Sequence, residues 1–190
     1  WIGANEGGVI LYNIKRSKFE DQTYINSNLY QGGQVKALEI DKQNKLWIGT
    51  VDGLVISTIN EQNLEKKNFM DSLLVGIISA LYCDPDGNMW IGTERTGGKP
   101  GLIKCNASNK DFKRVPVISG IIPKALIMDK KGVLWIGTGQ GLIGFKNDSI
   151  VSTVTQKDGL LSDNINLLTV GEDGSIYIGT NNGLNRYFPE

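Results

Sequence analysis

The sequence predicts an all-β protein made of consecutive β-propeller blades, each of them a four-stranded antiparallel sheet. One motif, Trp-Ile-Gly-Thr or a close variant, recurs five times along the 190 residues. The copies lie 42 to 46 residues apart, which is the length of one propeller blade. Between the copies, short apolar runs are interrupted by Gly, Asp and Asn, which indicates short strands and tight turns rather than helices.

Each copy of the motif begins with an aromatic residue and is followed by a second glycine. The aromatic position holds Trp1, Trp47, Trp90, Trp135 and Tyr177, and the second glycine is Gly8, Gly53, Gly101, Gly141 or Gly183. Because side chains alternate along a strand, Trp47 and Gly49 face one side and Ile48 faces the other. Both sides are apolar, so we expect each sheet to be covered on both faces by neighbouring sheets.

A turn signal precedes each motif and fixes the strands around it. Asp41, Asp84 and Asp129 stand six residues before a tryptophan, with Asn44, Gly87 and Gly132 three residues after them, and Gly171 and Gly174 occupy these places in the last repeat. This pattern is typical of a tight hairpin. In the first complete repeat it predicts strands over residues 35–40, 46–50, 54–58 and 64–69, with the first strand nearest the propeller axis.

The repeats predict a single propeller segment over residues 1–190, with units at about 1–34, 35–77, 78–122, 123–164 and 165–190. The first unit starts at its second strand and the last stops before a fourth strand. The units at both ends are thus incomplete, so we expect an open part of a larger propeller. Open blade edges leave backbone N–H and C=O groups without a neighbouring strand, which predicts self-association through these edges.

Composition excludes several classes of function. The 20 basic and 20 acidic residues balance, which argues against a nucleic-acid partner. The longest apolar stretch, Leu73 to Cys83, is interrupted by Gly76 and Ser79 and is too short to span a bilayer, so we expect no membrane contact by this segment. The chain contains no His, which removes Ser-His-Asp and Cys-His catalysis and His-based zinc sites. We expect no metal, no cofactor and no catalytic residues.

Two cysteines, Cys83 and Cys105, are predicted to lie in the first and third strands of one blade. A strand separates them, which puts their Cα atoms about 9 to 10 Å apart, beyond the reach of a disulfide. We therefore expect no disulfide between them.

The candidate ligand site lies in the loops, because strands in a propeller serve packing. The loop between the second and third strands is longest in the third unit, where residues 94–100 form an insertion containing Glu94, Arg95 and Lys99. Such side chains can bind a polyhydroxylated or acidic ligand. Further candidates in the equivalent loops and in one long inter-blade connection are Asn5, Asp52, Gln140, Asn182, Tyr30 and Gln31.

Two alternatives to a ligand-binding segment stay open. Asp52 and Glu94 offer the carboxylates that a glycosidase or lyase needs, although the sequence gives no separation between them. A protein–protein interaction scaffold is the other alternative.

The string Asp-x-x-Gly-x-Leu-Trp-Ile-Gly-Thr followed by Gly-Leu, best matched from Asp129 to Leu142, resembles the two-component regulator propeller repeat. Residues 158–164, Asp-Gly-Leu-Leu-Ser-Asp-Asn, are similar to that family's connection between blades. The resemblance implies a sensor propeller of a bacterial hybrid histidine kinase, in the periplasmic part of an inner-membrane protein. It further implies a seven-bladed ring, which needs more than roughly 300 residues, so this chain would be an incomplete segment of a larger seven-bladed propeller. It also implies signal transmission to a kinase elsewhere in the parent chain, with an oligosaccharide as the signal by analogy.

Overall fold

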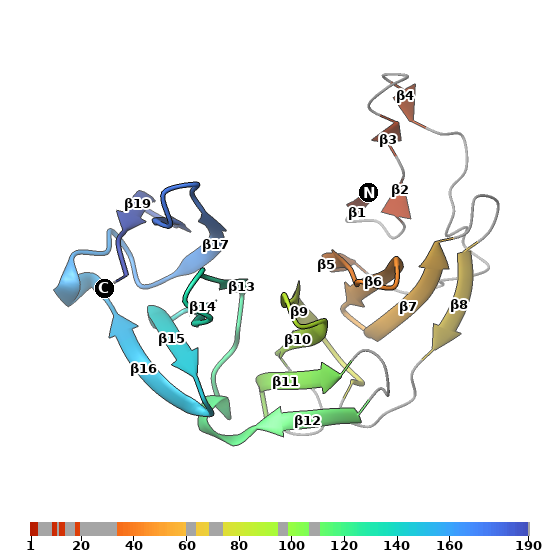
Figure 1. Cartoon of the computed structure of the whole chain (residues 1–190), viewed down its shortest axis with the longest axis horizontal. Coiled ribbons are helices and arrows are strands. Elements are labelled where there is room, and N and C mark those ends of the chain that lie inside the picture. Colours follow the sequence, from red (N-terminus) through yellow and green to blue (C-terminus); the bar gives the residue numbers. More distant parts are fainter. Residues whose placement is uncertain are drawn as a thin grey trace.

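The computed structural model describes residues 1–3, 9–10, 12–13, 18–19, 34–59, 64–68, 74–94, 99–106 and 111–189. Regular structure in these ranges is β apart from two single-turn 3-10 helices, η1 (Pro116–Ile118) and η2 (Gln156–Asp158). The sheets follow one another in chain order and form an open arc (Figure 1). The predicted all-β fold of four-stranded antiparallel sheets in an open arrangement is confirmed.

Three sheets have four strands in sequence order, and we number them blades 2 to 4. Blade 2 contains β5 (Val35–Ile40), β6 (Lys45–Thr50), β7 (Gly53–Ile59) and β8 (Leu64–Asn68). Blade 3 contains β9 (Ile78–Cys83), β10 (Asn88–Thr93), β11 (Gly101–Asn106) and β12 (Asp111–Val115). Blade 4 contains β13 (Ala125–Met128), β14 (Leu134–Gly137), β15 (Leu142–Lys146) and β16 (Ser149–Val154).

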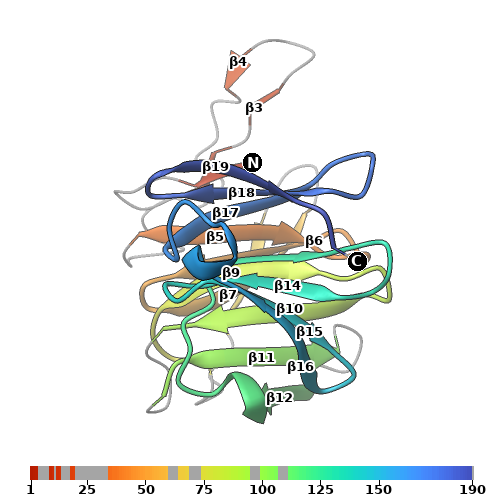
Figure 2. The same cartoon turned by 90° about the vertical axis from the view of Figure 1, so that its left-hand side faces the viewer.

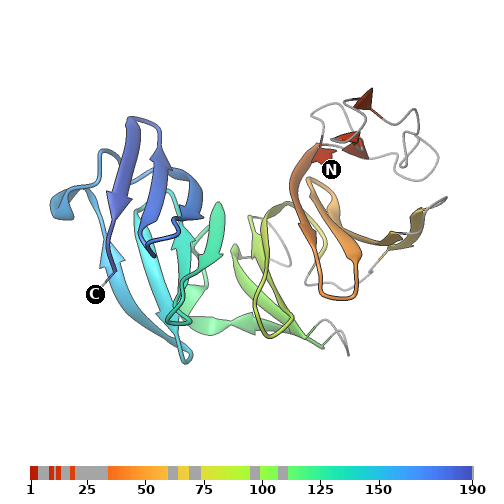
Figure 3. The same ribbon diagram turned by 45° about the horizontal axis from the view of Figure 1, so that its top comes forward.

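Blade 5 has three described strands, β17 (Ile165–Val170), β18 (Ile176–Thr180) and β19 (Gly183–Tyr187). Two short pairs precede blade 2: β1 (Ile2–Gly3) with β2 (Val9–Ile10), and β3 (Tyr12–Asn13) with β4 (Lys18–Phe19). The first strands of blades 2 to 5 line the inside of the arc and β8, β12 and β16 its outside, as predicted (Figure 1). Figure 3 shows the arc open between blade 5 and the N-terminal strands.

The core lies between the blades, and each tryptophan faces the following blade. Trp47 packs in a cluster with Ile78 and Ile91 of blade 3, and Trp135 packs with Ile165 and Ile178 of blade 5. The tryptophans Trp47, Trp90 and Trp135 are at most 6% exposed. The predicted alternation, with Trp on one face and Ile on the other, is therefore confirmed.

The glycine two residues after the tryptophan lets neighbouring blades approach each other. A Cβ on Gly137 would stand 2.6 Å from Cγ2 of Ile165, and one on Gly49 would stand 2.8 Å from Cγ2 of Ile78. Both isoleucines are completely buried at the start of the next blade, so they have little freedom to move aside. The motif glycine is thus a packing requirement between sheets.

In blades 2 to 4, a buried carboxylate holds the hairpin before the motif. In blade 4, Asp129 Oδ1 accepts the backbone N–H groups of Lys131 at 2.8 Å and Val133 at 2.9 Å, and Oδ2 accepts the indole N–H of Trp135 at 2.8 Å. The Asp41–Trp47 and Asp84–Trp90 pairs repeat the indole bond at 2.8 and 2.9 Å. One carboxylate therefore fixes both the turn and the ring of the tryptophan.

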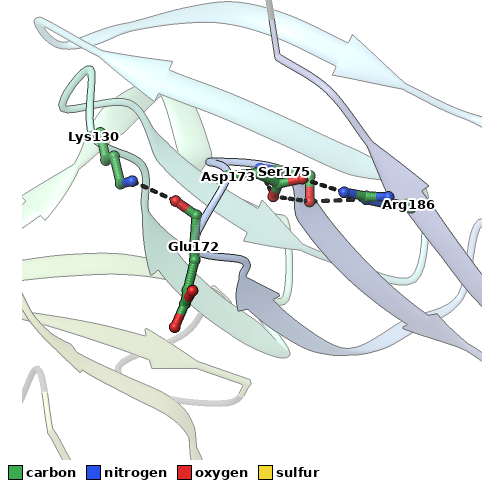
Figure 4. Close-up of polar contacts among 5 residues, drawn as sticks. All are labelled: Lys130, Glu172, Asp173, Ser175 and Arg186. Atoms are coloured by element: carbon green, nitrogen blue, oxygen red, sulfur yellow. Dashed lines mark hydrogen bonds and ion pairs between the residues drawn. The ribbon is translucent and has the colours of Figure 1, made fainter.

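Blade 5 replaces this arrangement. Gly171 stands where the other blades have Asp, and Tyr177 stands where they have Trp. Asp173 instead accepts the backbone N–H and hydroxyl of Ser175 at 3.0 and 2.7 Å, and it forms an ion pair with Arg186 (Figure 4). The Ser175 bonds, followed by Arg186, lower the pKa of Asp173 to about 2.

The two cysteines occupy the predicted strands. Met89 of β10 pairs with Cys83 on one side and Cys105 on the other, so a strand separates the two thiols. Both are free.

We predict that Gly137→Ala lowers the free energy of unfolding by about 1 to 3 kcal/mol, because the added methyl overpacks the blade 4 to blade 5 contact. Gly139→Ala is the matched control, since a Cβ there meets nothing within 4 Å. Urea denaturation measures both. Equal stabilities of the two variants would contradict the packing role.

A second prediction concerns the stability of the fold at acidic pH. Burial raises the pKa of Asp84, but hydrogen bonds from Asn88, Trp90 and the turn backbone outweigh it and hold the pKa below its ordinary value of 3.8. The unfolded chain therefore binds the Asp84 proton at higher pH than the folded chain, and stability from this group is lost as pH falls below about 4. Urea titrations from about pH 3 to 6 should show a shallower acid loss in Asp84→Asn than in the exposed control Glu172→Gln.

Candidate functional site

The turns after the second strands and the connections between blades meet at one end of the sheets. The Glu94 N–H donates to Ile77 O at 3.0 Å, Gly141 N–H to Asp163 O at 2.8 Å and Asn181 N–H to Asn164 O at 3.2 Å. Each bond joins the turn after a second strand to a connection between blades. We name this surface, formed by the turns after β6, β10, β14 and β18 and the connections before β9, β13 and β17, the upper rim.

Three of the predicted site residues occupy tight turns on the upper rim. Asp52, Gln140 and Asn182 are exposed. Their backbone N–H groups donate to the hydroxyls of Thr50, Thr138 and Thr180 at 3.1, 2.9 and 3.2 Å. These turns belong to blades 2, 4 and 5, so each residue lies at a separate place along the arc.

The insertion in blade 3 holds two more of the predicted residues. Glu94 is partly buried at its start and Lys99 is exposed near its end. Arg95 lies outside the described residues, as do Asn5, Tyr30 and Gln31. The proposed contribution of these four side chains stays a prediction.

A cavity of about 340 Å³ opens beside the end of the insertion. Its lining comes from β11, β12 and the connection that follows: Gly101, Leu102, Arg114, Val115, Pro116 and Ser119. The Arg114 guanidinium donates through Nη1 to Lys99 O at 3.1 Å, which ties the insertion to β12. A guanidinium can offer several planar donors to a carboxylate or to sugar hydroxyls. Arg114 is the residue that sequence reasoning missed.

Three titratable side chains with shifted pKa values lie on the inner strands β5 and β9. Burial raises the pKa of Glu39, Tyr82 and Cys83. A backbone hydrogen bond partly opposes each rise: from Cys83 to Glu39, from Met128 to Tyr82 and from Lys42 to Cys83. Glu39 and Tyr82 occupy equivalent places in blades 2 and 3, and each accepts a backbone bond from the first strand of the next blade. We interpret both as contacts that join inner strands.

Two further observations concern other kinds of site. In the described part of the chain, no three acidic or cysteine side chains gather as metal ligands would. The same residues contain no helix long and apolar enough to cross a membrane.

Comparison with known proteins shows the fold and a similarity to one family of repeats. The family model described as two component regulator propeller matches residues 29–52, 72–95 and 116–140. Histidine kinase P4 of Formosa agariphila is 27% identical over 157 residues, which cover 75% of this chain and 11% of that protein. This chain therefore spans a small part of that relative's length.

Solved structures share the fold. An extracellular domain assigned to a hybrid two component system from B. thetaiotaomicron superposes with a TM-score of 0.77 at 21% identity, covering all of this chain and 26% of that one. A virginiamycin B lyase from Staphylococcus aureus superposes with a TM-score of 0.59 at 14% identity, covering 80% of this chain and 52% of that one. Proteins of this fold thus include both an extracellular domain of a two component system and a lyase.

Proposed function

On the premise that this chain is built from two-component regulator propeller repeats, we propose that it is a ligand-binding segment of a bacterial sensor. The ligand is an oligosaccharide, and it binds on the upper rim of blade 3. The segment lies in the periplasmic part of an inner-membrane protein and passes the signal to a kinase elsewhere in the parent chain. Similarity to a histidine kinase and to an extracellular domain of a hybrid system supports this assignment.

The observation that carries the proposal is the coincidence of three features at one place. The long insertion, the Arg114 guanidinium and the cavity of about 340 Å³ all lie at the upper end of blade 3. The turns after β6, β14 and β18, in contrast, are short, although the hydroxyl of Thr93 in blade 3 donates to Gly101 O at 3.0 Å as the equivalent Thr hydroxyls do in the other blades. Loop residues on a rigid scaffold are the common means of ligand recognition, and blade 3 departs most from the repeat there.

The chemistry of this place suits a sugar. Leu102, Val115 and Pro116 supply an apolar wall, against which the non-polar face of a sugar ring can pack. Arg114 and Lys99 supply donors for hydroxyl or carboxylate oxygens, and Glu94 supplies an acceptor. An oligosaccharide carrying a uronic acid would use both kinds of contact.

We predict that replacing Glu94, Arg95 and Lys99 together by Ala weakens oligosaccharide binding at least about tenfold, which is roughly 1.4 kcal/mol, with little loss of stability. Arg114→Ala should weaken binding by a similar factor. Lys113→Ala is the matched control, because Lys113 is the exposed cation next to Arg114 on β12 and pairs with Asp111. Calorimetry with a panel of neutral and acidic oligosaccharides measures each affinity. Equal losses in Lys113→Ala and Arg114→Ala would contradict the assigned site.

The same preparation tests the enzyme alternative. We predict no turnover of polysaccharide, because the recurrent residues serve turns and packing and the chain has no His. Incubation with acidic and neutral polysaccharides, followed by reducing-end and unsaturated-sugar assays, measures this. Steady product formation that is lost in Asp52→Asn or Glu94→Gln would make the segment a glycosidase or lyase instead.

A further inference from the structure

The first strands of blades 2, 3 and 5 each carry an extra residue near their start. The ladder between β5 and β6 skips Lys36, the ladder between β9 and β10 skips Ser79, and the ladder between β17 and β18 skips Asn166. Each is the second residue of its strand, so the three β-bulges are equivalent. A bulge re-aims a side chain, and bulges are over-represented next to functional sites. One side chain per blade is thus set apart from the regular alternation of the strand.

The bulge position is polar in all four blades, although its neighbours in the chain are apolar. Blade 4 has Lys124 there, directly before β13. The flanking pairs are Val35 and Ala37, Ile78 and Ala80, Pro123 and Ala125, and Ile165 and Leu167. Lys36 and Asn166 are exposed, and Ser79 and Lys124 are half-buried. Packing between blades therefore does not account for the residue types at this position.

These side chains lie at the inner edge of the upper rim. Figure 2 shows the strands of successive blades running in roughly one direction, which brings their ends to two opposite rims. Two hydrogen bonds place the bulges at the upper one. Val51 N–H donates to Gln34 O, two residues before Lys36, and Asn181 N–H donates to Asn164 O, two residues before Asn166. The first strands line the inside of the arc, so the bulges lie on its inner side (Figure 1).

Side chains at this position reach from one blade to the next. The Ser79 hydroxyl donates at 2.6 Å to the carbonyl oxygen of the residue before Lys124. The Lys124 ammonium in turn donates to Asn164 Oδ1 in the connection before β17. A run of polar groups therefore extends along the inner edge from blade 3 to blade 5.

Several groups along this edge keep unused hydrogen-bonding capacity. Asn166 Nδ2 donates to Asn181 Oδ1 at 2.7 Å, and within the described ranges Asn166 Oδ1 and Asn181 Nδ2 have no hydrogen-bond partner. The Lys36 ammonium forms neither an ion pair nor a hydrogen bond with any described residue. Ammonium groups bind carboxylates, and amides offer both donors and acceptors to sugar hydroxyls. The inner edge is thus equipped to bind a ligand that carries both kinds of group.

We infer that the inner edge of the upper rim binds an oligosaccharide that carries carboxylates. The residues that form this surface are Lys36, Ser79, Lys124, Asn164, Asn166 and Asn181. The lysines bind the carboxylates, and the amides bind ring hydroxyls. Because the positions are spread over consecutive blades, an extended ligand contacts more of them than a monosaccharide does. The choice of an oligosaccharide rests on the proposed function, but the residues differ from those at the blade 3 insertion.

Calorimetry of the 190-residue chain with trigalacturonate tests this surface. We expect binding that is tighter than for monomeric galacturonate and that weakens as salt is added, because exposed charges are screened. The double variant Lys36→Gln, Lys124→Gln should bind trigalacturonate at least about tenfold more weakly, since Gln keeps a polar side chain but removes the charge. Lys124→Gln alone should show part of this loss.

Lys130→Gln is the matched control. Lys130 belongs to blade 4, like Lys124, and it also donates to blade 5, to Glu172 O at 2.7 Å, but from the turn at the other end of β13. It should leave binding unchanged, and circular dichroism should show all variants folded. Three results would overturn the inference: no binding at millimolar trigalacturonate, equal losses in Lys124→Gln and Lys130→Gln, or equal affinity for a triglutamate peptide.

Arg114→Ala separates this surface from the site proposed on blade 3. If that variant weakens trigalacturonate binding and the double lysine variant does not, the blade 3 site stands and the inner edge is overturned. The reverse result supports the inner edge and counts against the blade 3 site. Losses in both variants support the inner edge as one part of a longer binding surface.

Discussion

The buried hydrogen bond between an aspartate and a tryptophan indole is the interaction on which blades 2 to 4 depend. A carboxylate in the core is unfavourable unless its oxygens are satisfied, and here Asp41, Asp84 and Asp129 each accept the turn N–H groups as well as an indole N–H. The ring is thereby held against the following blade, where the motif glycine leaves room for the next strand. Local turn geometry and packing between sheets are set by the same side chain.

Contacts between blades also run along the turns. Lys42 follows the aspartate of blade 2 and donates to Pro85 O in the corresponding turn of blade 3, and Lys130 donates to Glu172 O in blade 5 at 2.7 Å (Figure 4). These exposed contacts add little to stability individually. They join equivalent positions, however, so the turn of blade 2 is placed relative to that of blade 3, and the turn of blade 4 relative to that of blade 5. The arc is thus ordered by apolar packing inside and by repeated polar contacts at the turns.

Much of the fold could be predicted because short local sequence patterns determine its turns and strands. The strands of blade 2 follow the predicted ranges to within one residue, since Asp, Asn and Gly mark the turns and the motif marks the second strand. The Asp–Trp bond was missed, although the sequence contains its signal: the one complete hairpin without Trp, at Tyr177, also lacks Asp, at Gly171. Arg114 could not be predicted, because its approach to Lys99 depends on how the end of β12 lies beside the insertion.

The surface of blade 3 proposed to bind a ligand follows from one constraint. Inside a blade, almost every position is committed: Trp, Ile and Gly to packing, Asp and Thr to turns. A ligand site is therefore expected where the repeat is interrupted, as it is by the insertion in blade 3. Beside the end of that insertion, the Arg114 guanidinium adjoins an apolar wall of Leu102, Val115 and Pro116, so a polar donor and an apolar surface occur together where the repeat pattern no longer dictates the residues.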